Sequence, residues 1–169
     1  MDLVTALAVV IGVLAAIATW VAVTVGSPYL LIWAIFLGWA SFFHCGGKEA
    51  GLKNSAIAKV WGAVCAAVAL VAALALGITA ITAAICVGVT VAIMILGAKV
   101  PALAAIPAGF SGYASTAAQF LLVVLPGGIA YGAGAGAIAK VAAAAAISMI
   151  IGNVLGYIPE KIAGALVKS

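Results

Sequence analysis

The chain has 169 residues, of which 69% are hydrophobic and 6% are charged, and its mean hydropathy is +1.45. A soluble domain carries about a quarter charged residues, so this composition excludes an ordinary soluble protein and predicts one embedded in a lipid bilayer. The net charge of +4 comes from lysines gathered at segment ends, which fits membrane orientation and disfavours nucleic-acid binding, since that calls for a clustered basic face.

Apolar blocks follow one another along the chain and predict membrane-spanning helices. Lipid offers no partner to an unpaired backbone amide, and no strand-like alternation of polar and apolar residues persists. About 20 residues cross the hydrocarbon. We expect the first block to be retained, because no basic residue precedes it and it is too long for the core of a cleavable signal. The six predicted spans are residues 3–25, 28–43, 56–76, 78–98, 101–125 and 137–158.

Glycine, proline and charged residues separate these spans. Residues 48–54 form the only strongly polar loop, and Gly77 parts the third span from the fourth. Pro159 is expected to end the sixth span, with residues 162–169 as a short surface helix.

Two of the predicted spans are irregular. The span 28–43 has only 16 residues, which reach roughly 24 Å across a hydrocarbon core of about 30 Å. Either the membrane thins there, or the turn that follows lies at membrane depth. The fifth span is interrupted by Pro107, Gly109 and Gly112.

The lysines are distributed unevenly between the two sides. Six spans place both termini, the polar loop and the turn at 99–100 on one side, which carries six lysines against one on the other. The positive-inside rule therefore predicts that both termini are cytoplasmic.

Three landmarks recur in the same order along the chain. A proline, the motif Gly-Trp-Ala-Ser at 38–41 and Ala-Ile-Ala-Lys at 56–59 are echoed by a proline, Gly-Tyr-Ala-Ser at 112–115 and Ala-Ile-Ala-Lys at 137–140. The second half needs a seven-residue insertion before its third landmark. We interpret the recurrence as an internal repeat.

Three spans per half is an odd number, so the second half must enter the membrane upside down relative to the first. The expected fold is an all-α polytopic membrane protein with six transmembrane helices in a 3+3 inverted-topology repeat. Its single membrane domain, 1–169, divides into halves 3–76 and 78–158 and a tail 159–169.

Inverted repeats hold a solute near mid-membrane, where short or interrupted segments of the two halves match. Here those segments are 28–47 and 101–128. The pathway candidates in them are Trp39, Ser41, His44, Cys45, Gly46, Gly47, Gly112, Tyr113, Ser115 and Gln119.

The matched pairs among these candidates have alternative roles. Trp39 and Tyr113 either line a constriction or belong to an aromatic belt at the membrane surface. Ser41 and Ser115 either offer hydroxyls to a solute or bond to their own backbone or a packing neighbour.

Three further polar residues are pathway candidates for which another role is favoured. Lys59 and Lys140 each sit one turn inside a span, where snorkelling to the headgroups is favoured over lining a pore. Asn153 lies within Gly152-x-x-x-Gly156, a close helix-packing motif, which favours a packing role.

The turn at 44–49 is the most chemically varied stretch. His44 could titrate near neutral pH and gate a pathway, and Gly46 and Gly47 could present backbone groups to a solute. The favoured alternative is a helix C-cap in which glycine ends the helix and Lys48 lies at its negative end.

The positions of the charged residues and the abundance of small residues predict a channel or facilitator for a small solute, neutral or weakly charged. The acidic residues Asp2, Glu49 and Glu160 all lie at segment ends, which disfavours pumping coupled to a buried carboxylate. The high alanine and glycine content predicts a narrow passage between closely packed helices.

A non-transporting structural or regulatory membrane protein is the alternative. An intramembrane enzyme using Cys45 and His44 is disfavoured, because no third group orients them. One histidine and three cysteines without a C-x-x-C pair predict neither a metal site nor a cofactor. A homo-oligomer is expected through the Gly-rich faces 132–136 and 152–156.

The stretch Phe-Phe-His-Cys-Gly-Gly-Lys-Glu at 42–49, following Gly-Trp-Ala-Ser at 38–41, resembles the bacterial inner-membrane proteins grouped as domain of unknown function 1097. The resemblance spans nearly the whole chain. It implies a bacterial inner-membrane location and supplies no activity or catalytic residues.

Overall fold

The computed structural model of the chain describes residues 2–26, 29–127 and 134–168, and the described segments are helices joined by turns, which confirms the all-α class. In chain order the elements are α1 (Leu3–Val25), α2 (Ile32–His44), α3 (Lys48–Leu76), α4 (Ala80–Leu96), the 3₁₀ turns η1 (Gly97–Lys99) and η2 (Pro101–Leu103), α5 (Ile106–Ala118), the π-helical segment η3 (Gln119–Val124), α6 (Leu125–Gly127) and α7 (Gly134–Lys168).

Within the described residues, four helical segments are long and apolar enough to cross a membrane: Leu3–Val25, Lys48–Leu76, Ala80–Lys99 and Gly134–Ile162. The two irregular spans have a different form. Each contains an α-helix of 13 residues, α2 and α5, which reaches about 20 Å. α5 continues into η3, so the helix changes its winding at Gln119.

Two expected boundaries are wrong. The predicted polar loop 48–54 forms the first turns of α3, because the Glu160 carboxylate accepts a 2.7 Å hydrogen bond from the Lys48 backbone amide and caps that helix. Pro159 lies inside α7 instead of ending it. Proline removes only one backbone donor, and this ring is fully buried in the packing, which is how membrane helices tolerate it.

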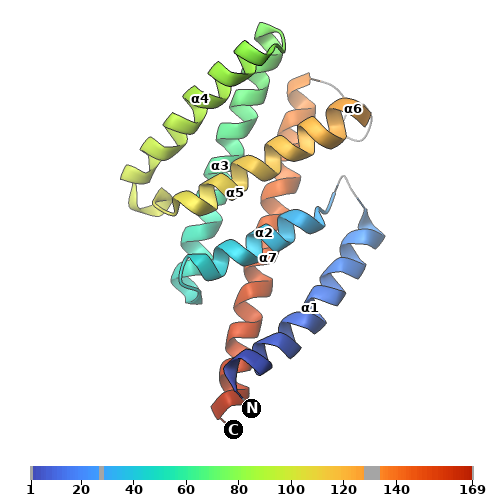
Figure 1. Ribbon diagram of the computed structural model, residues 1–169, viewed down its shortest axis with the longest axis vertical. Coiled ribbons are helices and arrows are strands. Elements are labelled where there is room, and N and C mark those ends of the chain that lie inside the picture. The colour runs from blue at the N-terminus through green and yellow to red at the C-terminus, as the bar shows by residue number, and fades with distance from the viewer. Residues whose placement is uncertain (1, 27–28, 128–133, 169) are drawn as a thin grey trace.

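The long helices α3 and α7 form the centre of the molecule (Figure 1). α4 lies along α3, and α1 lies along α7. The short helices cross the long ones: α2 packs against α7, and α5 packs against α3. Each short helix therefore crosses the long helix of the other half of the chain.

The crossing of α2 and α7 depends on glycine. A Cβ atom added to Gly38 would overlap the Met149 backbone carbonyl, and one added to Gly152 would overlap that of Ile35. At Gly156 an added Cβ would meet the Phe42 ring. The packing motif at 152–156 is thus confirmed, but it is occupied within the chain, so the expectation that this face joins a second copy is wrong.

The crossing of α3 and α5 is built in the same way. A Cβ atom on Gly112 would overlap the Lys59 backbone carbonyl, and one on Gly62 would overlap that of Gly109. The second face proposed for oligomer contacts, 132–136, lies partly outside the described residues.

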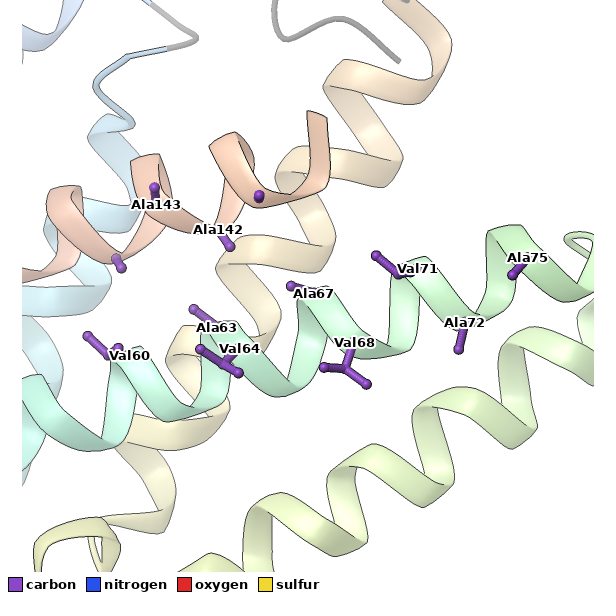
Figure 2. A pocket seen from close by; sticks show the side chains of 12 residues that line it. Val60, Ala63, Val64, Ala67, Val68, Val71, Ala72, Ala75, Ala142 and Ala143 are labelled. Atoms are coloured by element: carbon purple, nitrogen blue, oxygen red, sulfur yellow. The ribbon is translucent and has the colours of Figure 1, made fainter. Parts of the chain in front are cut away.

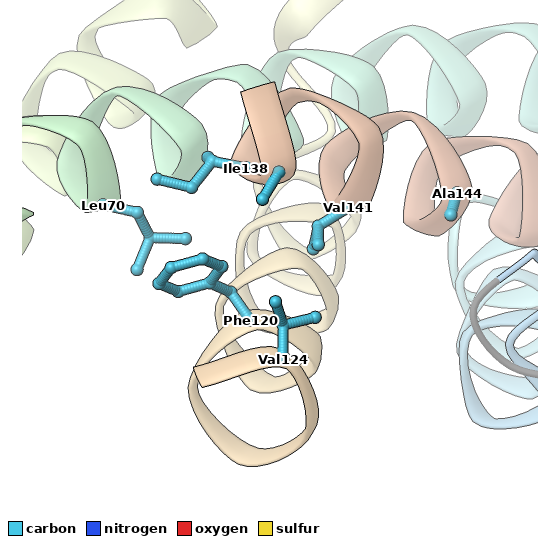
Figure 3. Packing of buried hydrophobic residues seen from close by; sticks show 7 residues of the cluster. Leu70, Phe120, Val124, Ile138, Val141 and Ala144 are labelled. Carbon is cyan, nitrogen blue, oxygen red and sulfur yellow. The ribbon is translucent and has the colours of Figure 1, made fainter. Parts of the chain in front are cut away.

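A buried apolar cluster and an apolar groove lie beside the central helices α3 and α7. Figure 3 shows Leu70 of α3 meeting Phe120 and Val124 of η3 and Ile138 of α7 in a buried cluster. A groove of about 620 Å³ lies between α3 and α7, and its twelve lining residues are all alanine or valine. Figure 2 shows these side chains on the two helices. Such a surface suits lipid chains and has no polar group to orient a solute.

Candidate functional site

Lys59 is the one lysine of the described residues whose side chain is fully buried, with 0% of its surface exposed. Its Nζ donates a 2.9 Å hydrogen bond to the Gly38 carbonyl of α2 and another to Oδ1 of Asn153 on α7. The expectation that Lys59 snorkels to the headgroups is therefore wrong. α3 begins at Lys48, so Lys59 lies about 16 Å along the helix, beyond reach of its end.

Asn153 extends this contact into a network. Its Nδ2 donates to the Leu52 carbonyl at 3.2 Å and to Ser55 Oγ at 2.8 Å, while its Oδ1 accepts from Lys59. Sequence reasoning assigned Asn153 to packing and missed Ser55. The available signal was the spacing of Ser55 and Lys59, four residues apart and so on one face of a helix.

The Lys59 ammonium has no carboxylate partner among the described residues. Asp2 accepts hydrogen bonds from the backbone and hydroxyl of Thr5 at the start of α1. Glu160 caps α3, and Glu49 accepts from the Tyr157 hydroxyl at 3.4 Å. An ammonium in this position is compensated only by carbonyl and amide dipoles, which is a costly arrangement.

A small pocket lies on the other side of Ser41, and Lys59 is not among its lining residues. Its volume is about 260 Å³, and it opens between α2 and α5 with the lining residues Leu37, Ala40, Ser41, His44, Pro107 and Ser111. Ser41 Oγ lies 2.8 Å from the Leu37 carbonyl and 3.0 Å from the Gly38 carbonyl. Its hydroxyl thus bonds to the backbone of its own helix. The Gly38 carbonyl accepts hydrogen bonds from both this hydroxyl and the Lys59 ammonium.

The matched aromatic residues lie elsewhere. Trp39 is buried, stacks on Phe36 with ring centroids 6.2 Å apart, and has no hydrogen-bond partner for Nε1 within the described part of the chain. Tyr113 is buried, and its hydroxyl lies 2.9 Å from Thr90 Oγ1. The surface-belt role is wrong for both, since neither faces outward.

The remaining polar candidates lie on α5, η3 and α7. Ser115 and Thr116 are buried, and neither hydroxyl has a partner among the residues that the structure describes. Gln119 is fully buried at the start of η3, and Lys140 is exposed on α7. Lys59 and Lys140, paired in the sequence repeat, therefore lie in opposite environments.

The turn after α2 is a helix cap, as favoured. Gly46 N–H donates to the Phe43 carbonyl at 3.0 Å and Gly47 N–H to that of Phe42 at 3.1 Å, which is the Schellman pattern. Gly46 has a φ of +86°, a conformation that glycine adopts without strain. The neighbouring Cys45 is a half-buried free thiol, and no hydrogen bond joins it to the exposed His44 within the described residues.

Comparison with known proteins identifies a family. A protein-family model described as "Protein of unknown function (DUF1097)" matches residues 8–164, nearly the whole chain. This match confirms the resemblance carried by residues 38–49. No curated protein and no solved structure matches the chain.

Proposed function

The chain belongs to the DUF1097 family, and we propose that it is a membrane channel or facilitator for a small solute, with its pathway at the interface of two inverted repeats. The observation that carries this proposal is Lys59, fully buried where α2, α3 and α7 meet and without a carboxylate partner in the described residues. An ionisable residue at membrane depth is costly, and those retained there usually line a solute or ion pathway.

The glycine contacts support the inverted repeat. Gly38 packs on the Met149 carbonyl as Gly112 packs on the Lys59 carbonyl. In this correspondence Lys59 matches Met149, nine residues beyond Lys140. The third landmark, Ala-Ile-Ala-Lys at 56–59 and 137–140, therefore does not align in this correspondence. The support for the repeat comes from the two helix crossings instead.

A second pair of contacts agrees with the same register. A Cβ on Gly152 would lie 2.8 Å from the backbone nitrogen of Trp39, and one on Gly62 would lie 3.0 Å from the backbone nitrogen of Tyr113. Trp39 and Tyr113 therefore hold equivalent places in α2 and α5. In inverted-repeat transporters the solute site lies at the repeat interface and is typically formed by discontinuous helices. Here α2 and α5 are the short helices that pack against the long helix of the other half.

We place the protein in the bacterial inner membrane with both termini cytoplasmic. The lysine distribution supports this orientation. The bond between Lys48 and Glu160 holds the α2–α3 turn and the later part of α7 at one end of the molecule. A C-terminal green fluorescent protein fusion should fluoresce and a C-terminal alkaline phosphatase fusion should be inactive; the reverse pattern would contradict the orientation.

Solute flux tests the function directly. The purified protein in liposomes should accelerate stopped-flow equilibration of at least one solute among water, glycerol, urea, acetate, formate, ammonium and bicarbonate. Ser111→Trp, which fills the pocket between α2 and α5, should abolish that flux. Val13→Trp on the exposed face of α1 is the matched control and should leave it unchanged. Folded, correctly inserted protein that moves none of these solutes would overturn the proposal.

The alternative is a structural or regulatory membrane protein that acts through partner contacts. One observation favours it: the Lys59 side chain is fully buried, and Asn153 uses both its oxygen and its amide nitrogen in hydrogen bonds to α3. In this alternative the network serves to join α2, α3 and α7. It predicts no flux for any solute and a stable partner recovered by cross-linking in intact membranes.

A further inference from the structure

A pocket of about 450 Å³ lies where α3 begins and α7 approaches its end. Its lining residues are Lys48, Glu160, Lys161, Gly164 and Ala165. α3 has 29 residues and reaches about 43 Å, which matches the thickness of about 40–45 Å of a bilayer with its headgroups. Lys48, the first residue of α3, therefore lies at the depth of the lipid headgroups, and so does the pocket that it lines.

The charged side chains of this pocket do not pair with one another. Among the described residues, no ion pair joins the Glu160 carboxylate to the ammonium of Lys48 or Lys161. Oε2 of Glu160 instead accepts the 2.7 Å hydrogen bond from the Lys48 backbone amide, and Lys161 Nζ lies 5.2 Å from the centre of the Tyr157 ring. Two ammonium groups and the second carboxylate oxygen, Oε1, are therefore left to interact with a ligand.

The backbone around the pocket holds the carboxylate in place. A Cβ atom on Gly47 would lie 3.0 Å from Glu160 Oε2 and 3.1 Å from Oε1, so the carboxylate rests against this glycine. Lys48 is the one non-glycine residue of the described segments with a positive φ, +56°, a conformation that has a cost for any side chain. Both lysine side chains are exposed, so they can adjust to a ligand while the carboxylate stays fixed.

The charges around the pocket limit the ligand. Glu49 lies close by, because its carboxylate accepts a 3.4 Å hydrogen bond from the hydroxyl of Tyr157, the ring that Lys161 covers. With Lys48 and Glu160, the group has two positive and two negative side chains. A purely anionic headgroup would be repelled by both carboxylates, whereas a headgroup with one phosphate and one ammonium finds a partner of opposite charge for each.

The carboxylate also distinguishes one ammonium from another. The primary ammonium of ethanolamine carries three N–H donors, as lysine does, and can donate to Glu160 Oε1. The quaternary ammonium of choline has no N–H and cannot. The pocket volume of about 450 Å³ is within the usual 300–1,000 Å³ of small-molecule sites, and the small residues Gly164 and Ala165 keep it open.

We infer that this pocket binds the headgroup of phosphatidylethanolamine from the surrounding bilayer, a role that is independent of the transport function proposed above. Lys48 and Lys161 pair with the lipid phosphate, and the lipid ammonium donates a hydrogen bond to Glu160 Oε1. A lipid bound in this way joins the α2–α3 turn to the later part of α7, which the bond between Lys48 and Glu160 already holds together.

Lipid binding is tested first with the unaltered protein in detergent micelles. Native mass spectrometry follows titration with dioleoyl lipids whose headgroups are phosphoethanolamine, phosphocholine or phosphoglycerol. The ethanolamine lipid should bind about tenfold more tightly than the other two, a ratio that corresponds to about 1.4 kcal/mol and is within reach of a hydrogen bond between charged groups. It should also raise the thermal unfolding temperature most. Equal binding of the three lipids, or tightest binding of the glycerol lipid, would overturn the inference.

Glu160→Gln separates headgroup recognition from helix capping. The amide oxygen of glutamine can still accept the hydrogen bond from the Lys48 backbone, so the cap is kept while the negative charge is lost. The variant should bind the ethanolamine and choline lipids equally, which is a loss of about tenfold in discrimination. A preference for ethanolamine that persists in folded Glu160→Gln protein would overturn the inference.

Lys161→Gln tests the phosphate contact and stands even if Glu160→Gln fails to fold, because the Lys161 side chain is exposed. Both the ethanolamine and the choline lipid carry the phosphate, so the variant should weaken the binding of each by a similar factor of about five, as expected for an exposed ion pair. Lys53→Gln is the matched control, since Lys53 is exposed on α3 and does not line the pocket.

The control should leave the affinity for both lipids unchanged. Unchanged lipid affinity in Lys161→Gln, or an equal loss in Lys53→Gln, would show that the pocket does not hold the phosphate and would overturn the inference.

Discussion

The two helix crossings of this molecule share a backbone arrangement and differ in chemistry. At both, a short helix lies so close to a long one that glycine is required on each side. Around the α2–α7 crossing, Lys59, Asn153 and Ser55 form a buried polar network. Around the α3–α5 crossing, the side chains are mainly apolar. Two hydrogen bonds run from there to α4: the Tyr113 hydroxyl bonds to Thr90, and Trp61 Nε1 donates to the Met94 carbonyl.

The comparison separates what builds the fold from what is added to it. Close approach needs only small residues and complementary surfaces. The glycine contacts of the α3–α5 crossing meet this need, and the Tyr113–Thr90 bond beside it joins α5 to α4. The polar network of the α2–α7 crossing is therefore not needed to bring the helices together. Its presence at one crossing alone points to a role beyond packing.

The largest loss of stability is expected from replacing the glycines that both crossings need. Gly38→Val and Gly112→Val should each lower the free energy of unfolding by about 3 kcal/mol, because the added carbons meet backbone carbonyls that cannot move aside. Unfolding in mixed detergent micelles, followed by circular dichroism, measures both. Gly88→Val on α4, where nothing lies within 4 Å, is the control and should change little. A large loss at one crossing only would show that the two are not equivalent.

A smaller loss of stability is expected from breaking the polar network that only the α2–α7 crossing has. Asn153→Leu should cost about 2 kcal/mol, because it leaves the Lys59 ammonium and the Leu52 carbonyl short of a partner. Adding Lys59→Met should recover most of that loss, since a buried polar pair can be replaced by apolar residues at little cost. A double-mutant cycle in the same unfolding assay measures the coupling. Additive losses would mean that the two residues do not act as a unit.

The smallest effect is expected at the apolar crossing. Tyr113→Phe should cost about 0.6 kcal/mol, the average for an interhelical hydrogen bond in a membrane protein. The partner Thr90 keeps a bond of 2.8 Å to the Cys86 carbonyl, so no hydroxyl is left unpaired. Solute flux should be unchanged. A loss of flux comparable to that of Ser111→Trp would place the pathway on this side as well.

Composition and helix breakers predicted much of the fold. The first and fourth spans agree with α1 and α4, and Gly77 ends α3 with a φ of +80° as expected of a glycine stop. The boundaries at 48 and 159 were not predictable from local signals. A carboxylate 112 residues away caps the first boundary, and tertiary burial of a proline ring removes the second.

The site was harder to predict than the fold. Apolar residues lie on every face of the helix around Lys59, including Ile57, Val60 and Trp61, so no amphipathic stripe shows which face is inward. Short strings such as Ala-Ile-Ala-Lys recur easily in an alanine-rich chain, and this one aligned a buried lysine with an exposed one. The glycines at the two crossings are spread among other glycines and become visible only once the helices are placed.

The bonds of Lys59 also have a consequence for how the chain assembles during synthesis. Its partner Asn153 lies 94 residues further along the chain, which a ribosome adds in about 5 to 20 seconds. Over that interval α3 is complete, yet its lysine, Ser55 and its first backbone amide lack the groups on α7 that satisfy them. The insertion machinery or neighbouring lipid headgroups must accommodate a charged helix until the last span arrives. A chain truncated before α7 is therefore expected to be a substrate for membrane proteases, because its first three helices present an unfinished polar surface.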